Sequence, residues 1–189
     1  MFLIAPIVAA MLLTPILGGD LRRLERIRVR HGWLLVVALG TQVWLIARPG
    51  PQTPFLTILE LAAYPLALAF LFLNSDIPGA WFVAIGAASN FLAIAVNGGV
   101  MPAARGAVVL AGRPLDYHGV YANSAPIAHP HLLFLGDVFA IPAGVPLANT
   151  FSVGDIVIAA GVVVAILATT LRGDPAEAAT AELGSDPSS

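Results

Sequence analysis

The stretch Asp20-Leu-Arg-Arg-Leu-Glu-Arg-Ile-Arg-Val-Arg-His31 sets five arginines against two acidic residues. It lies between two long runs, 2–17 and 33–47, that hold no charge at all. A helix needs about 20 mostly apolar residues to cross the hydrocarbon core of a bilayer, and cytoplasmic loops are enriched in Lys and Arg. The stretch therefore predicts a polytopic membrane protein whose arginine-rich loop faces the cytoplasm.

The composition supports the same class. Of the 189 residues, 58% are apolar and 11% are charged, with a mean hydropathy of +0.88, whereas soluble domains average about 25% charged residues. The net charge of −2 argues against a nucleic-acid partner. The chain has no cysteine, which excludes disulfides, thiolate metal sites and cysteine nucleophiles.

The hydropathy pattern predicts an all-α integral membrane protein with about five transmembrane helices in one domain over 1–172. The residues after that domain, 173–189, are rich in Ala, Glu, Asp and Ser and are expected to form a disordered acidic tail. The expected spans are 2–17, 33–47, 55–73, 80–96 and 151–171.

The arginines also predict an orientation in the cell membrane. With the 20–31 loop in the cytoplasm, the N-terminus lies outside and the C-terminus inside. Six arginines then lie inside and three, Arg48, Arg105 and Arg113, lie outside, which agrees with the positive-inside rule.

The stretch 132–147 is apolar but contains Asp137, Pro142 and Pro146. A helix of about 16 residues would be roughly 24 Å long, short of a hydrocarbon core of about 30 Å. We therefore expect a re-entrant or interfacial segment, with a sixth span as the alternative.

Three short motifs carry a resemblance: Asn97-Gly-Gly-Val-Met-Pro102, Leu135-Gly-Asp-Val138 and Asn149-Thr-Phe-Ser-Val-Gly-Asp-Ile156. Together with the arginine-rich first loop, and in this order, they resemble a family of small bacterial membrane proteins classed only as a domain of unknown function. The resemblance covers roughly residues 1–171. It implies the polytopic topology and suggests that these motifs face a common site on the outer side, but it implies no substrate, cofactor or reaction.

Glu60 is an ionisable residue within the third expected span, and Tyr64 lies one helical turn further on the same face. A carboxylate in a membrane helix usually faces the bundle interior or water. Glu60 is therefore a candidate proton- or cation-binding group or general base. The alternative is an interfacial glutamate that bonds a neighbouring helix.

Two asparagines, Asn90 and Asn97, share a face of the fourth span. For Asn90 we expect a hydrogen bond that joins helices. Asn97 precedes Gly98, Gly99 and Pro102, so this segment is either a broken helix that lines a ligand cavity or an ordinary helix end. Pro102 is expected to restart a helix or to end one.

Two aspartates follow glycines. Ser152 and Asp155 have the spacing of a capping box at the start of the last span, which favours a structural role for Asp155, with ligand binding as the alternative. Asp137 has no such explanation, so its charge must be paired, hydrated or neutralised. Arg105 and Arg113 are the nearby cations. A pair with either would make Asp137 a structural clamp, whereas a free Asp137 would be a ligand site.

Three histidines, His118, His129 and His131, lie in the connector 103–149. His129 and His131 would face the same way in an extended chain, so a metal site of nitrogen and oxygen ligands is a weak candidate. The spacing matches no standard zinc pattern, and no cofactor is expected.

Three functions remain open. The first is a non-catalytic subunit or scaffold of a membrane complex, with the bilayer and other subunits or a second copy as partners. The second is a small-solute or ion carrier that uses Glu60, Asp137 and the loop 97–102, with Asp155 nearby. The third is a membrane-embedded enzyme acting on a lipid or isoprenoid, although the chain shows no assembled catalytic group. The sequence favours the first.

Overall fold

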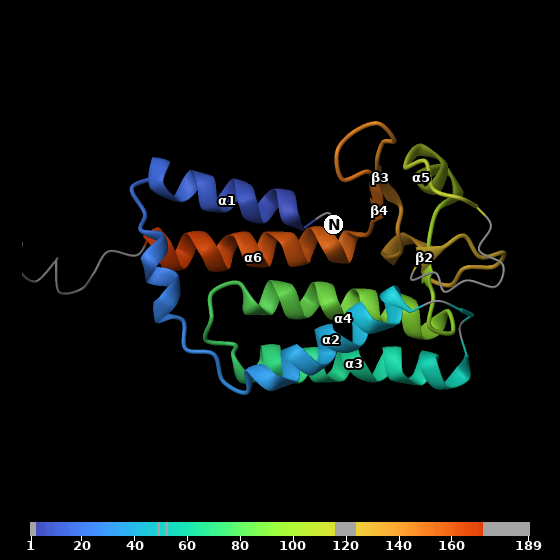
Figure 1. Cartoon of the computed structure of the whole chain (residues 1–189), viewed down its shortest axis with the longest axis horizontal. Helices are drawn as coiled ribbons and strands as arrows, with labels where there is room; N and C mark the ends of the chain where they lie inside the picture. Colours follow the sequence, from blue (N-terminus) through green and yellow to red (C-terminus); the bar gives the residue numbers. More distant parts are fainter. Residues whose placement is uncertain (1–2, 49, 52, 116–123, 172–189) are drawn as a thin grey trace, which may run out of the picture.

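The computed structural model describes residues 3–48, 50–51, 53–115 and 124–171 and is mostly helical, as Figure 1 shows. This confirms the helical class. A long helix forms in each of the five apolar stretches, and their bounds follow the expected ones closely: α1 (Ile4–Ile16), α2 (Gly32–Ala47), α3 (Pro54–Leu73), α4 (Ala80–Val96) and α6 (Val153–Leu171). The expected acidic tail lies outside the described residues.

Two of these helices, α3 and α6, are long and apolar enough to cross a membrane, with mean hydropathies of 2.0 and 2.2 over their best windows. The other three are apolar but shorter. The two long helices give weak support for a membrane association.

By their contacts, the five long helices pack in the order α1, α6, α4, α3, α2. In Figure 1, α2 crosses in front of α3 and α4. The arginine-rich segment contains a 3-10 helix, η1 (Leu21–Arg26), at one end of this bundle, beside the 74–79 link and the C-terminal end of α6. The segments that follow α2 and α4 lie at the opposite end. The charged connections are therefore sorted to the two ends of an apolar bundle.

Glycines allow α4 and α6 to approach closely. A Cβ on Gly86 would lie 2.5 Å from the carbonyl oxygen of Gly154, and one on Gly161 would lie 2.8 Å from that of Gly79. Both distances are shorter than a van der Waals contact, so the two backbones can lie this close only because these positions carry no side chain. Small residues that let backbones meet are the usual means of packing helices within membranes, where the hydrophobic effect does not drive association.

Polar contacts join the segments at the arginine-rich end. The Asp20 N–H donates to the Thr170 carbonyl at 3.1 Å, and this attaches the start of η1 to the end of α6. The Asn74 side chain, almost fully buried, forms two hydrogen bonds with the backbone of Arg30, at 2.7 and 2.9 Å. These bonds hold the arginine-rich segment against the ends of α3 and α6.

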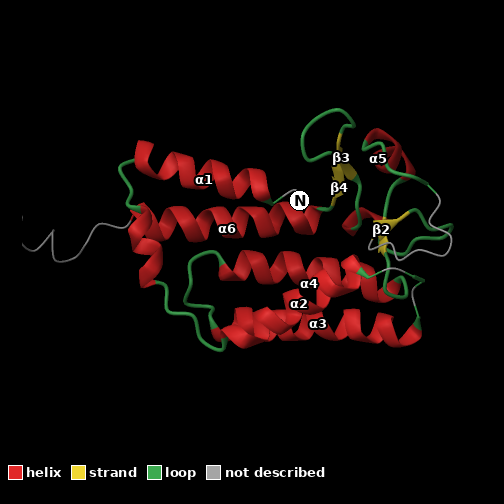
Figure 2. Ribbon diagram, in the orientation of Figure 1, coloured by secondary structure: helices red, strands yellow, loops and turns green. Residues whose placement is uncertain are grey.

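The opposite end carries a cap of short strands, which Figure 2 shows in yellow. Strand β1 (Met101–Pro102) pairs in parallel with β2 (Ser124–Ala125), and β3 (Phe139–Ile141) pairs antiparallel with β4 (Asn149–Phe151). The short helix α5 (Arg105–Leu110) packs on the second pair. The backbone groups of these loops are thus paired with one another at the end of the bundle.

Two expectations for this end are wrong. The stretch 132–147 forms no long helix but a 3-10 turn, η2 (Leu133–Leu135), and β3, so the alternative of a sixth helical span is wrong. Pro102 neither restarts nor ends a helix: it lies in β1, where its carbonyl accepts the Asp137 N–H at 2.9 Å. Prolines fit such a short strand because the missing N–H can point away from the partner.

The glycine contact between α4 and α6 can be tested by Gly86→Ala. The added methyl must displace backbone and Ile158, and overpacking of this kind costs about 1–3 kcal/mol. The control is Gly40→Ala in α2, where a Cβ meets nothing within 4 Å, and helix propensity predicts a gain of about 0.8–1 kcal/mol. Thermal unfolding in detergent measures both, and equal effects would contradict the close approach.

Candidate functional site

Asp155 forms the capping box that the sequence predicts. The Asp155 N–H donates to the Ser152 hydroxyl at 3.0 Å, and the Ser152 N–H donates to Asp155 Oδ2 at 2.9 Å. These two bonds satisfy backbone N–H groups that the first turn of α6 would otherwise leave without partners. Ser152 is fully buried, so the cap lies inside the protein and not at its surface.

Asn90 connects this cap to α4. Its Nδ2 donates to Asp155 Oδ1 at 2.9 Å, and its Oδ1 accepts the Ser152 hydroxyl at 2.9 Å. Asn90 therefore has the helix-joining role expected of it. The three side chains form a closed polar unit between α4 and α6, which we call the Asn90 network (Asn90, Ser152 and Asp155).

Asn97 caps the C-terminal end of α4. The backbone forms a Schellman motif, in which the Gly99 N–H donates to the Ile94 carbonyl at 2.9 Å and Gly98 has a φ of 70°. The Asn97 side chain then forms two hydrogen bonds with the backbone of His131, at 2.8 and 2.9 Å. Of the two alternatives for this segment, the helix end is the one observed.

Gly99 has a separate reason to be glycine. With φ at 90°, a Cβ there would lie 2.5 Å from the Thr57 side chain, so this turn packs directly on α3. Gly98 thus provides the positive φ of the helix end, and Gly99 allows the loop to pack on α3.

Asp137 is held by its backbone and by two hydroxyls. Its N–H and C=O bond to Pro102 and Ala104, at 2.9 and 3.0 Å, which fixes the residue beside β1. Its Oδ2 accepts the Ser124 hydroxyl at 2.6 Å and the Thr150 hydroxyl at 2.9 Å. Asp137 is 6% exposed. Its carboxylate joins β2 to β4, and its backbone attaches both to β1.

Arg113 reaches the same group of side chains. Its Nη1 lies 2.8 Å from the Thr150 hydroxyl and 3.4 Å from Asn149 Oδ1. Arg113 therefore approaches Asp137 through the shared Thr150 hydroxyl and does not form with it the direct pair that the sequence offered as one alternative. Arg105 is exposed on α5.

The environment of Asp137 disfavours its ionised form. Burial raises the pKa of this carboxyl above its usual range, and the neighbouring Asp155 raises it further. The hydrogen bonds from Ser124 and Thr150 and the charge of Arg113 lower the pKa, but burial has the largest effect. A proton on Asp137 is therefore bound more tightly than on an exposed aspartate.

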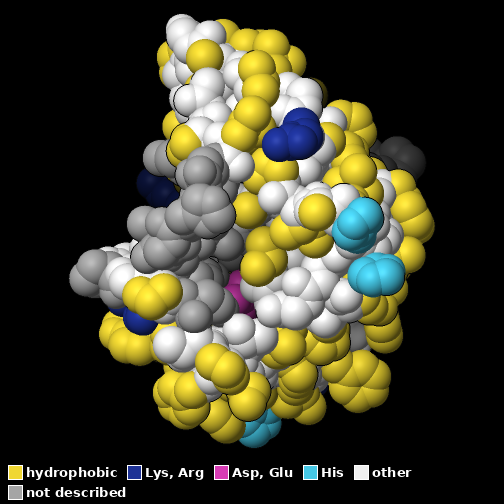
Figure 3. All heavy atoms as spheres, turned by 90° about the vertical axis from the view of Figure 1, so that its right-hand side faces the viewer, with side chains coloured by type: hydrophobic (Ala, Val, Ile, Leu, Met, Phe, Trp, Pro, Cys, Tyr) yellow, Lys and Arg dark blue, Asp and Glu magenta, His cyan; other side chains and the backbone are white. Residues whose placement is uncertain are grey.

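Polar side chains converge on a cavity of about 420 Å³ between the cap and the bundle. In the space-filling view of this end, an acidic side chain is visible in a recess (Figure 3). The cavity is lined by four apolar residues (Leu3, Ile46, Ile94 and Met101) and by polar ones from both sides: Tyr64, Asn90, Arg113, Ser124, Asp137, Asn149, Thr150 and Asp155. Its volume lies in the range of small-molecule sites.

Of the residues proposed from the sequence, Asp137 and Asp155 line this cavity, whereas Asn97, Gly98, Gly99 and Pro102 support the loops around it. Glu60 is fully buried in α3, where Gln42 Nε2 donates to its backbone carbonyl at 3.4 Å, and it is not a lining residue. Tyr64, one helical turn after Glu60, does line the cavity. Its ring packs on that of Phe91 at a centroid distance of 5.4 Å.

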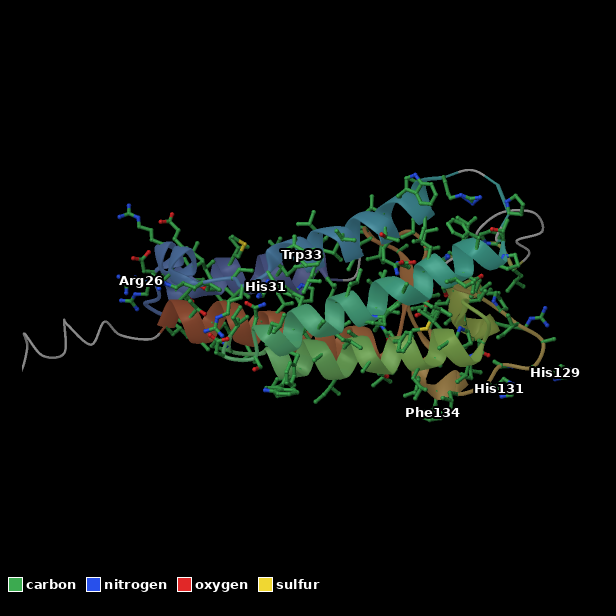
Figure 4. All side chains as sticks on the ribbon, turned by 90° about the horizontal axis from the view of Figure 1, so that it is seen from below. Arg26, His31, Trp33, His129, His131 and Phe134 are labelled. Atoms are coloured by element: carbon green, nitrogen blue, oxygen red, sulfur yellow. The ribbon has the colours of Figure 1, made fainter. Side chains whose placement is uncertain are left out.

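The histidines lie apart from this cavity. Figure 4 shows His129 and His131 at the outer edge of the cap, and both are exposed. No three His, Asp or Glu side chains of the described residues gather closely enough to hold a metal ion. His118 lies outside the described residues.

Sequence reasoning missed Ser124 and Thr150, which hold the Asp137 carboxylate. Thr150 lies within the motif 149–156 and could have been suspected from it. Ser124 has no such signal, because only the parallel pairing of β1 with β2 brings it next to Asp137.

The comparisons with known proteins identify a family but no activity. The model of DUF5317, a family of unknown function, matches residues 26–167. No curated protein matches the chain. No solved structure matches it either.

The Asn90 network predicts a large effect of Ser152→Ala. The change removes the cap and leaves the Asp155 N–H and Asn90 Oδ1 without this partner inside the protein. We expect a loss of about 2–3 kcal/mol in the free energy of unfolding. The control is Thr53→Ala, at an exposed cap of α3 with one bond of 3.4 Å, where about 0.5 kcal/mol is expected. Thermal unfolding distinguishes them, and similar losses would argue against the network.

Asp137→Asn should change how stability depends on pH. Because the folded state raises the pKa of Asp137, ionisation is easier in the unfolded state. The free energy of unfolding should therefore fall as the pH rises from about 4, the usual carboxyl pKa, through the raised value. Asn cannot ionise but can still accept both hydroxyls, so the variant should lack this decline and be the more stable protein near neutral pH. If the free energies of unfolding of the two proteins change in the same way with pH across this range, the raised pKa does not belong to Asp137.

Proposed function

Because the chain belongs to DUF5317, a family of unknown function, we propose its function from its own geometry: a multi-pass protein of the cell membrane that binds a small polar solute in the cavity at its capped end. The observation that carries the proposal is the convergence of two carboxylates, a guanidinium and a tyrosine on that cavity. Binding at such a site is the first step of the carrier function that the sequence left open.

The surface of the bundle supports a membrane location. Only 22% of the most apolar window of α3, and of α6, is buried inside the protein. The core helix of a soluble protein would be mostly buried. The shorter helices also expose large apolar side chains, among them Ile16 at 76% and Val36 at 71%. Apolar area on this scale needs lipid or protein around it.

The arrangement of charges supports the proposed orientation. Five arginines, at positions 22, 23, 26, 28 and 30, belong to the segment at one end of the bundle, whereas Arg48, Arg105 and Arg113 belong to the other. By the positive-inside rule, the arginine-rich end faces the cytoplasm. The cavity then opens on the outer side of the membrane.

The cavity favours a cationic or zwitterionic solute. Its lining contains two carboxylates, Asp137 and Asp155, and one cation, Arg113. Among the described residues, Asp137 Oδ1 accepts no hydrogen bond, and the Tyr64 hydroxyl donates none. One acceptor and one donor are therefore available to a ligand, whereas the Asn90 network is engaged internally.

A second function, a non-catalytic subunit of a membrane complex, is favoured by the hydrogen bonds themselves. Asp155, Asn90 and Ser152 bond to one another, and Ser124 and Thr150 bond to Asp137. Polar groups that bond to one another in this way stabilise the fold and do not need a ligand. In that case the cavity would hold only water and the exposed apolar helices would meet partner subunits.

Ligand binding by the purified protein separates the two functions. Putrescine, a diamine, and alanine, a zwitterion, are the probes, and succinate is the anionic control. A bound ligand at 100 times its Kd stabilises by about 2.7 kcal/mol, and for a chain of this size this corresponds to a rise in Tm of about 5–10 °C. We expect this rise with at least one of the two probes and none with succinate.

The variants make this test specific. Asp137→Asn should weaken binding of the active probe at least tenfold, since hydrogen bonds to charged groups contribute about 1.5–3 kcal/mol. The matched control is Asp76→Asn, an exposed carboxylate at the other end of the bundle. Solute binding is refuted if neither probe stabilises the protein, or if both variants bind the active probe as the unmodified protein does.

A further inference from the structure

A second cavity lies at the arginine-rich end, far from the proposed solute site. It is an apolar crevice of about 160 Å³ between η1, α3, α4 and α6. Leu24 and Ile27 of the arginine-rich segment form one wall, and Phe70, Val83 and Val162 of the long helices form others. The crevice is thus built from both the bundle and the charged loop.

The crevice offers a ligand almost no polar group. Asn74 is its one polar lining residue, and the Asn74 amide is occupied by the carbonyls of Arg30 and Phe70 at 2.9 and 2.8 Å. The Asn74 Oδ1 accepts the Arg30 N–H at 2.7 Å. A hydrocarbon chain fits such a lining, whereas a polar solute would lose its hydration without compensation.

Arginines surround the segment that forms the wall. Arg22, Arg26 and Arg28 alternate with Leu24 and Ile27 along the chain, and all three are exposed. Figure 4 shows Arg26 directed away from the helices at this end. Among the described residues, the acidic side chains at this end are Asp20, Glu25 and Asp76, so the described part of the segment carries net positive charge.

We propose that this end of the protein binds one anionic phospholipid, with an acyl chain in the crevice and its phosphate on the exposed arginines. The positive charge of the segment favours an anionic headgroup over a cationic one. Guanidinium groups match phosphate oxygens in geometry as well as in charge. The apolar wall formed by Leu24 and Ile27 places the chain beside the headgroup site, as an amphiphile requires. This inference does not depend on the solute site.

Native mass spectrometry with defined lipids tests the inference. Dioleoyl phosphatidylglycerol and dioleoyl phosphatidylcholine, which share their acyl chains, are titrated separately into the detergent-solubilised protein. We expect one phosphatidylglycerol to be retained with at least tenfold higher affinity than phosphatidylcholine. Equal retention of the two lipids, or gradual uptake of many copies without saturation at one, would overturn the proposal.

Two arginine variants assign the headgroup site. Arg22→Gln combined with Arg28→Gln changes two exposed side chains and does not threaten folding; it should abolish the preference for phosphatidylglycerol. The control is Arg105→Gln, an exposed arginine at the opposite end, and it should retain the preference. An equal loss in both proteins would mean that overall charge, and not this site, attracts the lipid.

A further pair of variants assigns the acyl-chain site. Val162→Phe fills the crevice and should reduce retention of phosphatidylglycerol at least fivefold, whereas Val164→Phe, on an exposed position of the same helix, should not. Glycerol 3-phosphate tests the headgroup alone, and it should not compete with the lipid at equal concentration. Full competition by glycerol 3-phosphate, or unchanged retention in a folded Val162→Phe protein, would overturn the chain assignment.

Discussion

The contact between α4 and α6 is the constraint on which the rest of the structure depends. Glycines on both helices remove the side chains that would keep the two backbones apart. The Asn90 network then closes the same contact with two hydrogen bonds between buried or half-buried groups, in addition to the cap itself. Because these bonds join fixed positions on α4 and at the start of α6, they also help to set the register of the two helices.

This contact places the elements at both ends. At the capped end, α4 ends at Asn97 and α6 begins after Ser152, so the loops between them must return across the top of the bundle. The cap closes this path by pairing β1 with β2 and β3 with β4, and Asp137 joins the pairs through Ser124 and Thr150. The cavity is the space left between this cap and the helices. At the other end, the same contact brings the start of α4 beside α6 and leaves the apolar crevice under η1.

Local patterns determined a good part of this structure. Apolar runs predict the five long helices because a long apolar run is the main local signal for such a helix. The Ser152–Asp155 spacing predicts the capping box, and the helix end at Asn97-Gly-Gly was one of two alternatives, because both depend on residues within one turn of each other. The structure of the stretch 132–147 was harder to predict, since apolar content does not distinguish a short helix from a strand that pairs with a distant partner.

The sequence by itself determined the helices, the capping box at Ser152 and Asp155 and the segregation of arginines, because these properties depend on composition and on near neighbours. Only the tertiary structure decided that Ser124, Thr150 and Arg113 share the site with Asp137, that Tyr64 reaches the cavity and Glu60 does not, and that the histidines lie apart from it. These relations join residues far apart in the chain. They follow from the pairing of strands and the close packing of α4 on α6, which no local pattern encodes.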